Sequence, residues 1–156
     1  MIGTEHDAWR AILEWVACPC GCEDHEIFLS ADDPQRTKRI IGSGEARTAW
    51  LVNGVVYKIG RASSNEYEHH ALTAWREAGA HWAPETSLYT FDMWHGGTEV
   101  VIAMPYLPND GSPVEESDLD EIRRAAPQTW SGNYTTHQGR TYLIDGQDIE
   151  IYPEAK

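Results

Sequence analysis

A cysteine cluster with a nearby histidine is one group in this chain whose residue types could bind a metal. Its members are Cys18, Cys20, Cys22 and His25. Thiolates and an imidazole bind Zn²⁺ or Cu(I). Structural zinc sites typically use cysteine pairs separated by about two to four residues, so one ion held by these alternating cysteines would be strained. The alternative is a reduced, cysteine-rich turn without metal, and both interpretations stay open.

Two other segments combine glycine with polar side chains. In the first, Gly42 and Gly44 lie between two β-like runs, and Lys58 ends a later apolar run. In the second, Asn133 follows a glycine, and Asp145 follows an apolar pair and precedes another glycine. On the residues alone, the first pattern is equally typical of a glycine turn, and Asp-Gly is also a hairpin signal. The chemistry of these residues therefore depends on the elements that position them.

The first half of the chain predicts a helix followed by strands. Residues 4–17 place apolar side chains on one helical face, with Thr4 as the N-cap. Residues 38–59 predict three antiparallel strands, the last two joined by Asn53-Gly54, which is the strongest hairpin signal in the chain. Residues 64–78 then predict a helix that ends at a glycine.

The second half of the chain predicts shorter elements on both sides of a connector. Residues 105–113 are rich in Pro, Gly, Asn and Asp and are the best candidate for a boundary between two lobes. The other predicted elements are strands at 88–91 and 100–104, a helix at 117–126 with Ser117 as N-cap, a hairpin at 134–144 and a last strand at 149–151.

The order of these elements resembles the small lobe of protein kinases and of the related aminoglycoside and small-molecule phosphotransferases. In both, a glycine loop, a strand that carries a lysine, a helix, two strands and a proline-rich connector follow one another. The resemblance covers about residues 38–107 by element order and residues 117–145 more loosely.

This resemblance implies an α+β fold. We expect a kinase-like small lobe, with a five-stranded antiparallel sheet and one αC-like helix, a minimal helix-and-hairpin remnant of the large lobe, and an extra N-terminal helix. The expected single domain, 1–156, has an N-terminal helix and Cys-rich loop (1–37), the small lobe (38–107), and the connector with the remnant (108–156).

The resemblance also implies a nucleotide site. Gly42 and Gly44 match two glycines of the phosphate loop, and Lys58 matches the lysine that holds the α- and β-phosphates. Two carboxylates compete to be the partner of this lysine. Helical periodicity puts Glu68 on the apolar face, where a carboxylate needs a cation, and Glu66 on a polar face. The alternative is that Lys58 and Glu68 are both surface residues.

The segment after the fifth strand resembles the hinge that holds adenine. By this match, Met104 borders the pocket, Pro105 offers its carbonyl and Leu107 offers its N–H. Proline has a carbonyl but no N–H, so Pro105 is compatible with the role. The alternative is a plain strand followed by a turn.

Asn133 and Asp145 match the two Mg²⁺ ligands of the family, and oxygen ligands suit this ion. Several positions depart from the family pattern, among them Ala49 in place of the usual valine and Asp145-Gly146-Gln147, which lacks the phenylalanine. Gln128 stands in place of the catalytic aspartate, Trp130 in place of a histidine and Arg47 in place of the third glycine. The segment after Asp145 is short, so we expect no activation segment and no substrate platform.

The charge of the chain narrows its partners. The formal net charge is −13, from 12 basic and 25 acidic residues, which argues against nucleic acid and anionic membranes and favours basic partners. The polar N-terminus and the lack of a long apolar run predict a cytoplasmic protein. The seven tryptophans could fill the core or form a partner-binding surface.

The sequence therefore predicts a kinase-like protein that binds ATP and Mg²⁺, either a pseudokinase or a very weak phosphotransferase, similar to small kinase-like proteins of actinobacteriophages. One alternative is a non-catalytic scaffold that binds a protein partner, such as a phage protein that acts on a host factor. Another is an active phosphotransferase with an unusual base. Nucleotide affinity separates the scaffold from the other two, and turnover separates those from each other.

Overall fold

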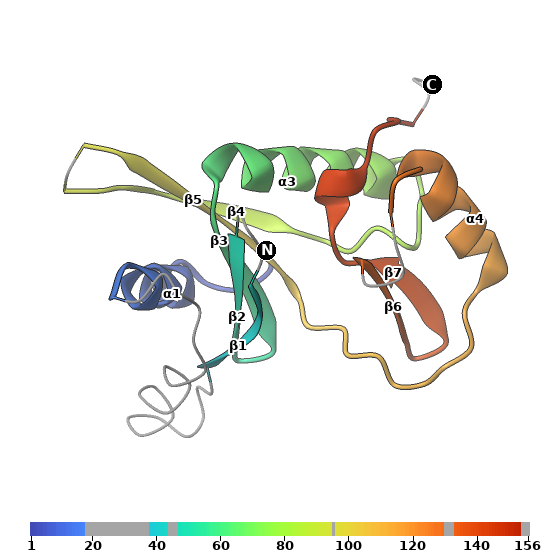
Figure 1. The fold of residues 1–156 in the computed structure, drawn as a ribbon, viewed down its shortest axis with the longest axis horizontal. Coiled ribbons are helices and arrows are strands. Elements are labelled where there is room, and N and C mark those ends of the chain that lie inside the picture. The colour runs from blue at the N-terminus through green and yellow to red at the C-terminus, as the bar shows by residue number, and fades with distance from the viewer. Residues whose placement is uncertain (18–37, 44–46, 95, 130–132, 154–156) are drawn as a thin grey trace. The chain divides into compact units, whose positions relative to one another are not determined.

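The structure, a computed structural model, confirms the α+β class (Figure 1). It describes residues 1–17, 38–43, 47–94, 96–129 and 133–153. The chain divides into two compact units. The first contains residues 1–66 and 86–106, and the second contains residues 67–85 and 107–156. Helix α3 (Ala62–Glu77) begins in the first unit and ends in the second.

The first unit is built on an antiparallel sheet with the strand order β1-β2-β3-β5-β4. The strands are β1 (Lys38–Ser43), β2 (Arg47–Val52), β3 (Val55–Gly60), β4 (Ser87–Asp92) and β5 (Thr98–Pro105). The predicted hairpin between β2 and β3 is confirmed. Asn53 and Gly54 both have positive φ angles, 51° and 75°, as a type I′ turn requires.

Strand β4 lies at one end of this order and pairs with β5 along its whole length, from Ser87 opposite Ala103 to Asp92 opposite Thr98. In the part of the chain that the structure describes, the other edge of β4 has no neighbouring strand. An edge strand presents backbone N–H and C=O groups to which a further strand can bond.

Helix α1 (Glu5–Ala17) packs on the sheet of the first unit. The predicted N-cap is confirmed, because the Thr4 hydroxyl accepts a hydrogen bond of 3.1 Å from the Asp7 N–H. The Thr4 N–H donates to the Tyr57 hydroxyl at 3.1 Å, which ties the start of the helix to β3. The core of this unit consists of Ala8, Ala11, Ile12, Trp50, Val52, Tyr57, Ile59, Tyr89, Met93, Val101 and Ala103.

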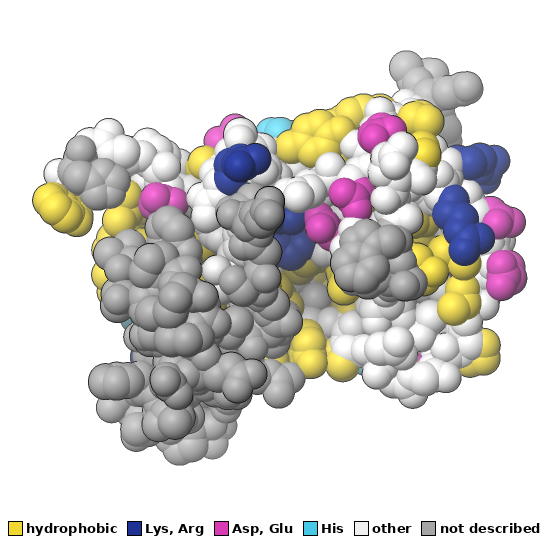
Figure 2. All heavy atoms as spheres, viewed as in Figure 1, with side chains coloured by type: hydrophobic (Ala, Val, Ile, Leu, Met, Phe, Trp, Pro, Cys, Tyr) yellow, Lys and Arg dark blue, Asp and Glu magenta, His cyan; other side chains and the backbone are white. Residues whose placement is uncertain are grey.

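The second unit combines helix α4 with a short hairpin. Its further elements are α4 (Glu116–Ala125), β6 (Tyr134–His137), β7 (Arg140–Leu143) and the 3₁₀ helix η2 (Gly146–Asp148). Buried Trp82 links them, since its carbonyl accepts from the Leu143 N–H at 2.9 Å and its indole N–H donates to Glu121 at 2.6 Å. Figure 2 shows acidic and basic side chains together at the right-hand edge, where Figure 1 draws α4, as expected for a solvated helix face.

Two predictions about the ends of α4 and of the described chain are wrong. The N-cap of α4 is Glu115 and not Ser117, and the Glu115 N–H donates to the Thr141 hydroxyl at 2.9 Å. Residues 149–151 do not form a strand. The N–H groups of Glu150 and Ile151 donate to the Ala125 carbonyl at the end of α4, at 2.9 and 3.0 Å. These N–H groups are therefore not available for pairing with another strand.

In the described ranges, every helix is too short or too polar to span a lipid bilayer.

Candidate functional site

Lys58 lies on β3, the central strand of the sheet in the first unit. It pairs with Ala49 on β2 and with Ile102 on β5, and its side chain is only 9% exposed. The alternative of a surface lysine is therefore wrong. A buried ammonium group is costly unless its charge is compensated, so this position is typical of a lysine with a structural or functional counterpart.

Asn65 fixes the backbone at this lysine, and the sequence analysis did not single it out. It is fully buried, and its Nδ2 donates to the carbonyls of Lys58 at 3.0 Å and Val100 at 2.7 Å. Its Oδ1 accepts from Nη1 of Arg47 at 3.0 Å. The signal was present, because Asn65 shares one helical face with Leu72 and lies on the apolar side of α3.

The glycine segment differs from the prediction. Gly42 lies within β1 and not in a loop, since it pairs with Ala49 just after a β-bulge between Ile40 and Gly42. The bulge adds one residue to β1, so the strand continues through Gly42 to Ser43 and does not end before this glycine. Gly44 lies outside the described residues. Arg47, at the position of the expected third glycine, starts β2.

The hinge-like segment has a register that suits the expected role of Pro105. Met104 is buried and pairs with Val56, and Pro105 is partly buried opposite Val55. The Tyr106 N–H donates to the Gly54 carbonyl at 3.0 Å, which makes Val55 and Pro105 a non-hydrogen-bonded pair. In such a pair the carbonyl of Pro105 points away from β3. Leu107, the other expected adenine contact, is partly buried and belongs to the second unit.

Glu68 is completely buried in the second unit, whereas Glu66 is exposed, as the helical periodicity predicted. The alternative of a surface glutamate at position 68 is wrong. Gly146 packs directly on this part of α3. A Cβ atom at Gly146 would lie 3.0 Å from Cγ of Glu68 and 2.7 Å from Cγ of Leu72. The structure thus brings Glu68 next to the turn that begins at Asp145.

Asn133 and the turn after β7 lie at the same end of the β6–β7 hairpin. The Ile144 N–H donates to the Asn133 carbonyl at 2.8 Å, and the Asn133 side-chain Nδ2 donates to a carboxylate oxygen of Asp148. Asp145 begins η2 and accepts from the Gln147 N–H at 3.2 Å. Asp145-Gly146 therefore starts a 3₁₀ turn, and the alternative of a hairpin turn at this dipeptide is wrong.

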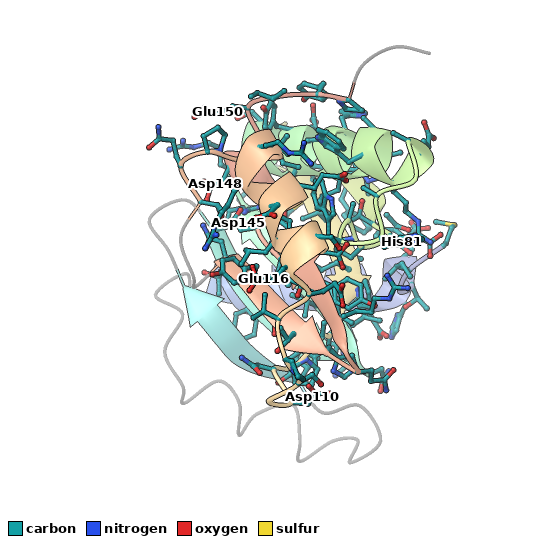
Figure 3. All side chains as sticks on the ribbon, turned by 90° about the vertical axis from the view of Figure 1, so that its right-hand side faces the viewer. His81, Asp110, Glu116, Asp145, Asp148 and Glu150 are labelled. Carbon is teal, nitrogen blue, oxygen red and sulfur yellow. The ribbon has the colours of Figure 1, made fainter. Side chains whose placement is uncertain are left out.

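Asp148 is a polar neighbour of this site that sequence reasoning missed. Figure 3 shows Asp145 and Asp148 near each other, with Asp110 at the opposite end of the view. Because Nδ2 of Asn133 donates to Asp148, the amide oxygen is the atom of Asn133 that suits a cation. An amide oxygen with aspartate carboxylates is a donor set that Mg²⁺ accepts, together with waters and phosphate oxygens. The signal that could have found Asp148 is a second aspartate three residues after Asp145, in Asp-Gly-Gln-Asp.

Other expected positions carry less information. Gln128 is exposed, and its amide has no group that takes a proton at neutral pH. Trp130 lies outside the described residues, as do Cys18, Cys20, Cys22 and His25. Among the described residues, no three or more His, Cys, Asp or Glu side chains gather into a group that could hold a metal.

Two adjacent histidines on α3 differ in their exposure. His69 is partly buried, while His70 is exposed. Burial lowers the pKa of His69, and the neighbouring His70, with ring centroids 5.4 Å apart, lowers it further. A neutral imidazole is thereby favoured at position 69.

Comparison of the chain with protein-family models, with curated proteins and with solved structures gives no match. The kinase-like resemblance therefore rests on element order and on individual residues.

Proposed function

We propose that this chain is a kinase-like protein that binds ATP together with Mg²⁺ and transfers phosphate slowly or not at all. One observation carries the proposal. The lysine and the glutamate chosen for it, Lys58 and Glu68, are 9% and 0% exposed. Ionisable side chains are rarely buried to this extent without a partner or a role.

Each proposed ligand group has a defined role. Lys58 would hold the α- and β-phosphates, and Glu68 would orient its ammonium group. Asn133 and Asp145 would hold Mg²⁺, which lowers the repulsion between the phosphates. Asp148 supports this assignment, because its contact with Asn133 fixes the direction of the amide.

The adenine ring would be held by the segment after β5. The register supports this role for Pro105, whose carbonyl is not used by β3. Met104 would contact the ring, and the N–H of Leu107 would complete the recognition of its polar edge.

Weak catalysis is part of the proposal. Phosphoryl transfer depends mainly on positioning and on charge stabilisation, which Lys58 and a metal ion supply. The group that orients or deprotonates the acceptor is replaced by Gln128. Binding without rapid turnover is the expected result.

The first experiment is isothermal titration calorimetry of the whole chain with ATP, with and without Mg²⁺. We expect binding that requires Mg²⁺ and that weakens at least about ten-fold in Lys58→Met, since one charge-assisted contact is worth about 1.5–3 kcal/mol. The matched control is Arg61→Met, which removes a positive charge at an exposed position near the end of β3. Circular dichroism establishes that each variant is folded.

The metal ligands are tested by the same titration. Asp145→Asn should remove the Mg²⁺ dependence, while Asp120→Asn, an exposed aspartate on α4, should leave it intact. Absence of binding by the folded wild-type chain at millimolar ATP would overturn the proposal and leave the interaction scaffold. Phosphate release during the titration would instead identify the active phosphotransferase.

A further inference from the structure

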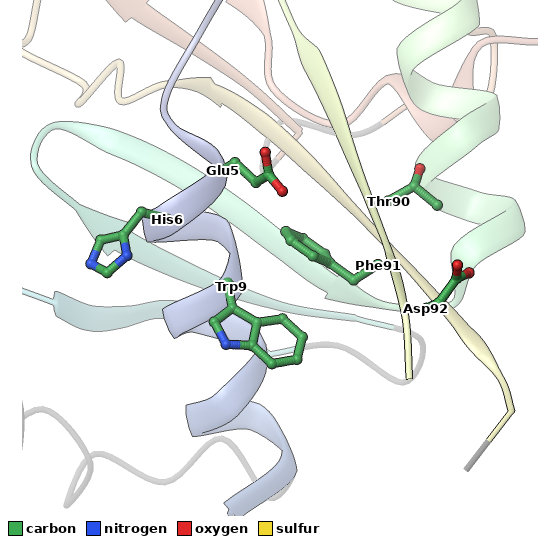
Figure 4. Close-up of a pocket in the computed structure, with 6 residues that line it drawn as sticks. All are labelled: Glu5, His6, Trp9, Thr90, Phe91 and Asp92. Carbon is green, nitrogen blue, oxygen red and sulfur yellow. The ribbon is translucent and has the colours of Figure 1, made fainter. Parts of the chain in front are cut away.

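A groove between α1 and β4 lies on the face of the first unit's sheet that α1 covers (Figure 4). Its volume is about 690 Å³, and its lining residues are Glu5, His6, Trp9, Thr90, Phe91 and Asp92. Figure 4 shows Phe91 extending from β4 toward α1, while Glu5 and Trp9 extend from α1 toward β4. The side chains of His6, Thr90 and Asp92 point away from the space between α1 and β4.

Two aromatic rings line the groove, one from α1 and one from β4. The centroids of Trp9 and Phe91 lie 5.3 Å apart with the ring planes tilted by 46°, and both side chains are partly buried. Aromatic faces carry partial negative charge and attract guanidinium and ammonium groups, and tryptophan does so most strongly. The α1 side and the β4 side of the groove thus each offer a cation an aromatic ring.

A carboxylate, that of Glu5, lines the same groove. Glu5 is exposed in the first turn of α1. Its field reaches β4: burial is the main cause of the raised pKa of Tyr89, and the charge of Glu5 raises it further. With a net charge of −13 for the chain, a positively charged partner is attracted both at the groove and at a distance.

The groove also runs beside a strand edge. β4 ends the order of the sheet, and in the described residues its outer edge faces no strand. An extended peptide can add to such an edge through backbone hydrogen bonds and place every second side chain on one face. A side chain on the α1 face would then lie over Phe91 and Trp9.

We propose that this groove is a docking site for an extended, arginine-bearing segment of a basic partner protein. The guanidinium lies on the rings of Trp9 and Phe91 and pairs with the carboxylate of Glu5. Arginine fits better than lysine because its planar group stacks on aromatic rings and bonds a carboxylate in two places. This site is separate from the proposed nucleotide function and does not depend on it.

The test is an NMR titration of the ¹⁵N-labelled whole chain with a blocked peptide of alternating threonine and valine that carries one central arginine. We expect shifts of the Trp9 indole N–H and of the backbone amides of β4. A second peptide with citrulline in place of arginine keeps the shape and removes the charge. It should bind at least about five-fold more weakly.

Three variants separate the contributions of the groove. Trp9→Leu and Phe91→Leu keep apolar volume and should each weaken binding of the arginine peptide about two- to five-fold. Glu5→Gln should weaken it about two- to five-fold at low salt and less at high salt. Glu116→Gln is the matched control, since Glu116 occupies the first turn of α4 and the same charge is removed. It should leave binding unchanged.

Two results would overturn the proposal. The first is equal affinity for the arginine and citrulline peptides, or shifts that spare Trp9 and β4 in the folded wild-type chain. The second is self-association in sedimentation equilibrium that Phe91→Leu abolishes, because the groove would then hold a second copy of this chain.

Discussion

Two buried polar side chains, one in each unit, differ in how their polar atoms are satisfied. In the first unit, buried Asn65 uses both ends of its amide, with contacts to Lys58, Val100 and Arg47. In the second unit, buried Asp118 has a carboxylate oxygen, Oδ2, without a hydrogen-bond partner among the described residues. Buried polar groups usually have a hydrogen-bond partner, so a buried oxygen without one needs an explanation.

A second difference concerns the elements that carry the candidate ligands. In the first unit they lie on paired strands, so a regular ladder fixes the directions of Lys58 and Pro105. In the second unit Asn133, Asp145 and Asp148 lie where strands end and a 3₁₀ turn begins. The positions of the candidate ligands in the first unit are therefore fixed by the register of the sheet. Those in the second unit are fixed by a few side-chain contacts. Each prediction below tests that division.

The largest effect is expected for Asn65→Leu in the first unit. Leucine keeps a similar volume but leaves the carbonyls of Lys58 and Val100 without this donor. We expect the free energy of unfolding to fall by about 2–4 kcal/mol, because each unpaired buried polar group costs about 1–3 kcal/mol. The measurement is urea unfolding followed by circular dichroism.

The matched control for that substitution is Ser63→Ala, an exposed position on the same helix. Its effect should stay within about 0.5 kcal/mol. An Asn65→Leu loss as small as the control's would contradict the view that this amide holds the first unit together.

The next effect is expected for Gly146→Ala in the second unit. The new methyl group would lie 2.7 Å from Cγ of Leu72, which is closer than real contacts allow, and 3.0 Å from Cγ of Glu68, which is a tight contact. We expect a loss of about 1–3 kcal/mol in the free energy of unfolding, as for other overpacked sites. Gln147→Ala, at the exposed neighbouring position, is the control and should change little. Equal stability of the two variants would show that the turn is not packed on α3.

The features that the sequence predicted correctly depend on residues close together in the chain. The hairpin at Asn53-Gly54 and the cap at Thr4 follow from local chemistry, since a type I′ turn needs positive φ and a free helix N–H needs an acceptor. The burial of Glu68 followed from helical periodicity, which records which face of a helix is apolar. These are short-range rules, and the structure confirms them.

The wrong predictions depended on distant partners. Residues 149–151 have the composition of a strand, but their N–H groups bond to Ala125, far back in the chain. Ser117 has the right side chain for a cap, yet the Glu115 N–H bonds to Thr141 across the second unit and the helix begins earlier. The contact of Asn133 with Asp148 belongs to the same class. A local pattern does not contain such partners.

A smaller effect of opposite sign is expected for Asp118→Asn. Burial is the main cause of the raised pKa of Asp118, and nearby Arg140 opposes it only in part. Because the folded-state pKa exceeds the unfolded value, the folded state holds its proton longer, and stability falls as pH rises from the unfolded pKa through the folded one. The variant, which never ionises, should gain up to about 1 kcal/mol at pH 7 and nothing at pH 3.

The measurement for that variant is the free energy of unfolding in urea at both pH values, for the wild type, for Asp118→Asn and for Asp120→Asn. Asp120 is exposed on the same helix, so its variant controls for the change in net charge. Destabilisation by Asp118→Asn at pH 7 would mean that the attraction of Arg140 outweighs burial. The second unit would then have no strained carboxylate, and the contrast with Asn65 would disappear.

The smallest effect concerns Asp110, the counterpart of Asp118 in the same unit. Hydrogen bonds from the side chain of Ser112 and from the N–H groups of Gln138 and Ser112 lower the pKa of Asp110 to about 2. Its contribution to stability is present above the unfolded pKa and is lost as pH falls toward about 2. Ser112→Ala removes the largest of these causes, so a ¹³C NMR titration of the carboxyl group should give a pKa closer to the ordinary value.

Ser117→Ala is the control for Ser112→Ala, because its hydroxyl bonds to Glu115 and not to Asp110. It should leave the pKa of Asp110 unchanged. The pKa of exposed Asp110, which accepts several hydrogen bonds, and the pKa of buried Asp118 should then differ from the ordinary value in opposite directions. If Asp110 titrates normally in the wild type, its turn does not hold the carboxylate. Neither of these two aspartates of the second unit would then have a carboxylate that is fully satisfied by hydrogen bonds.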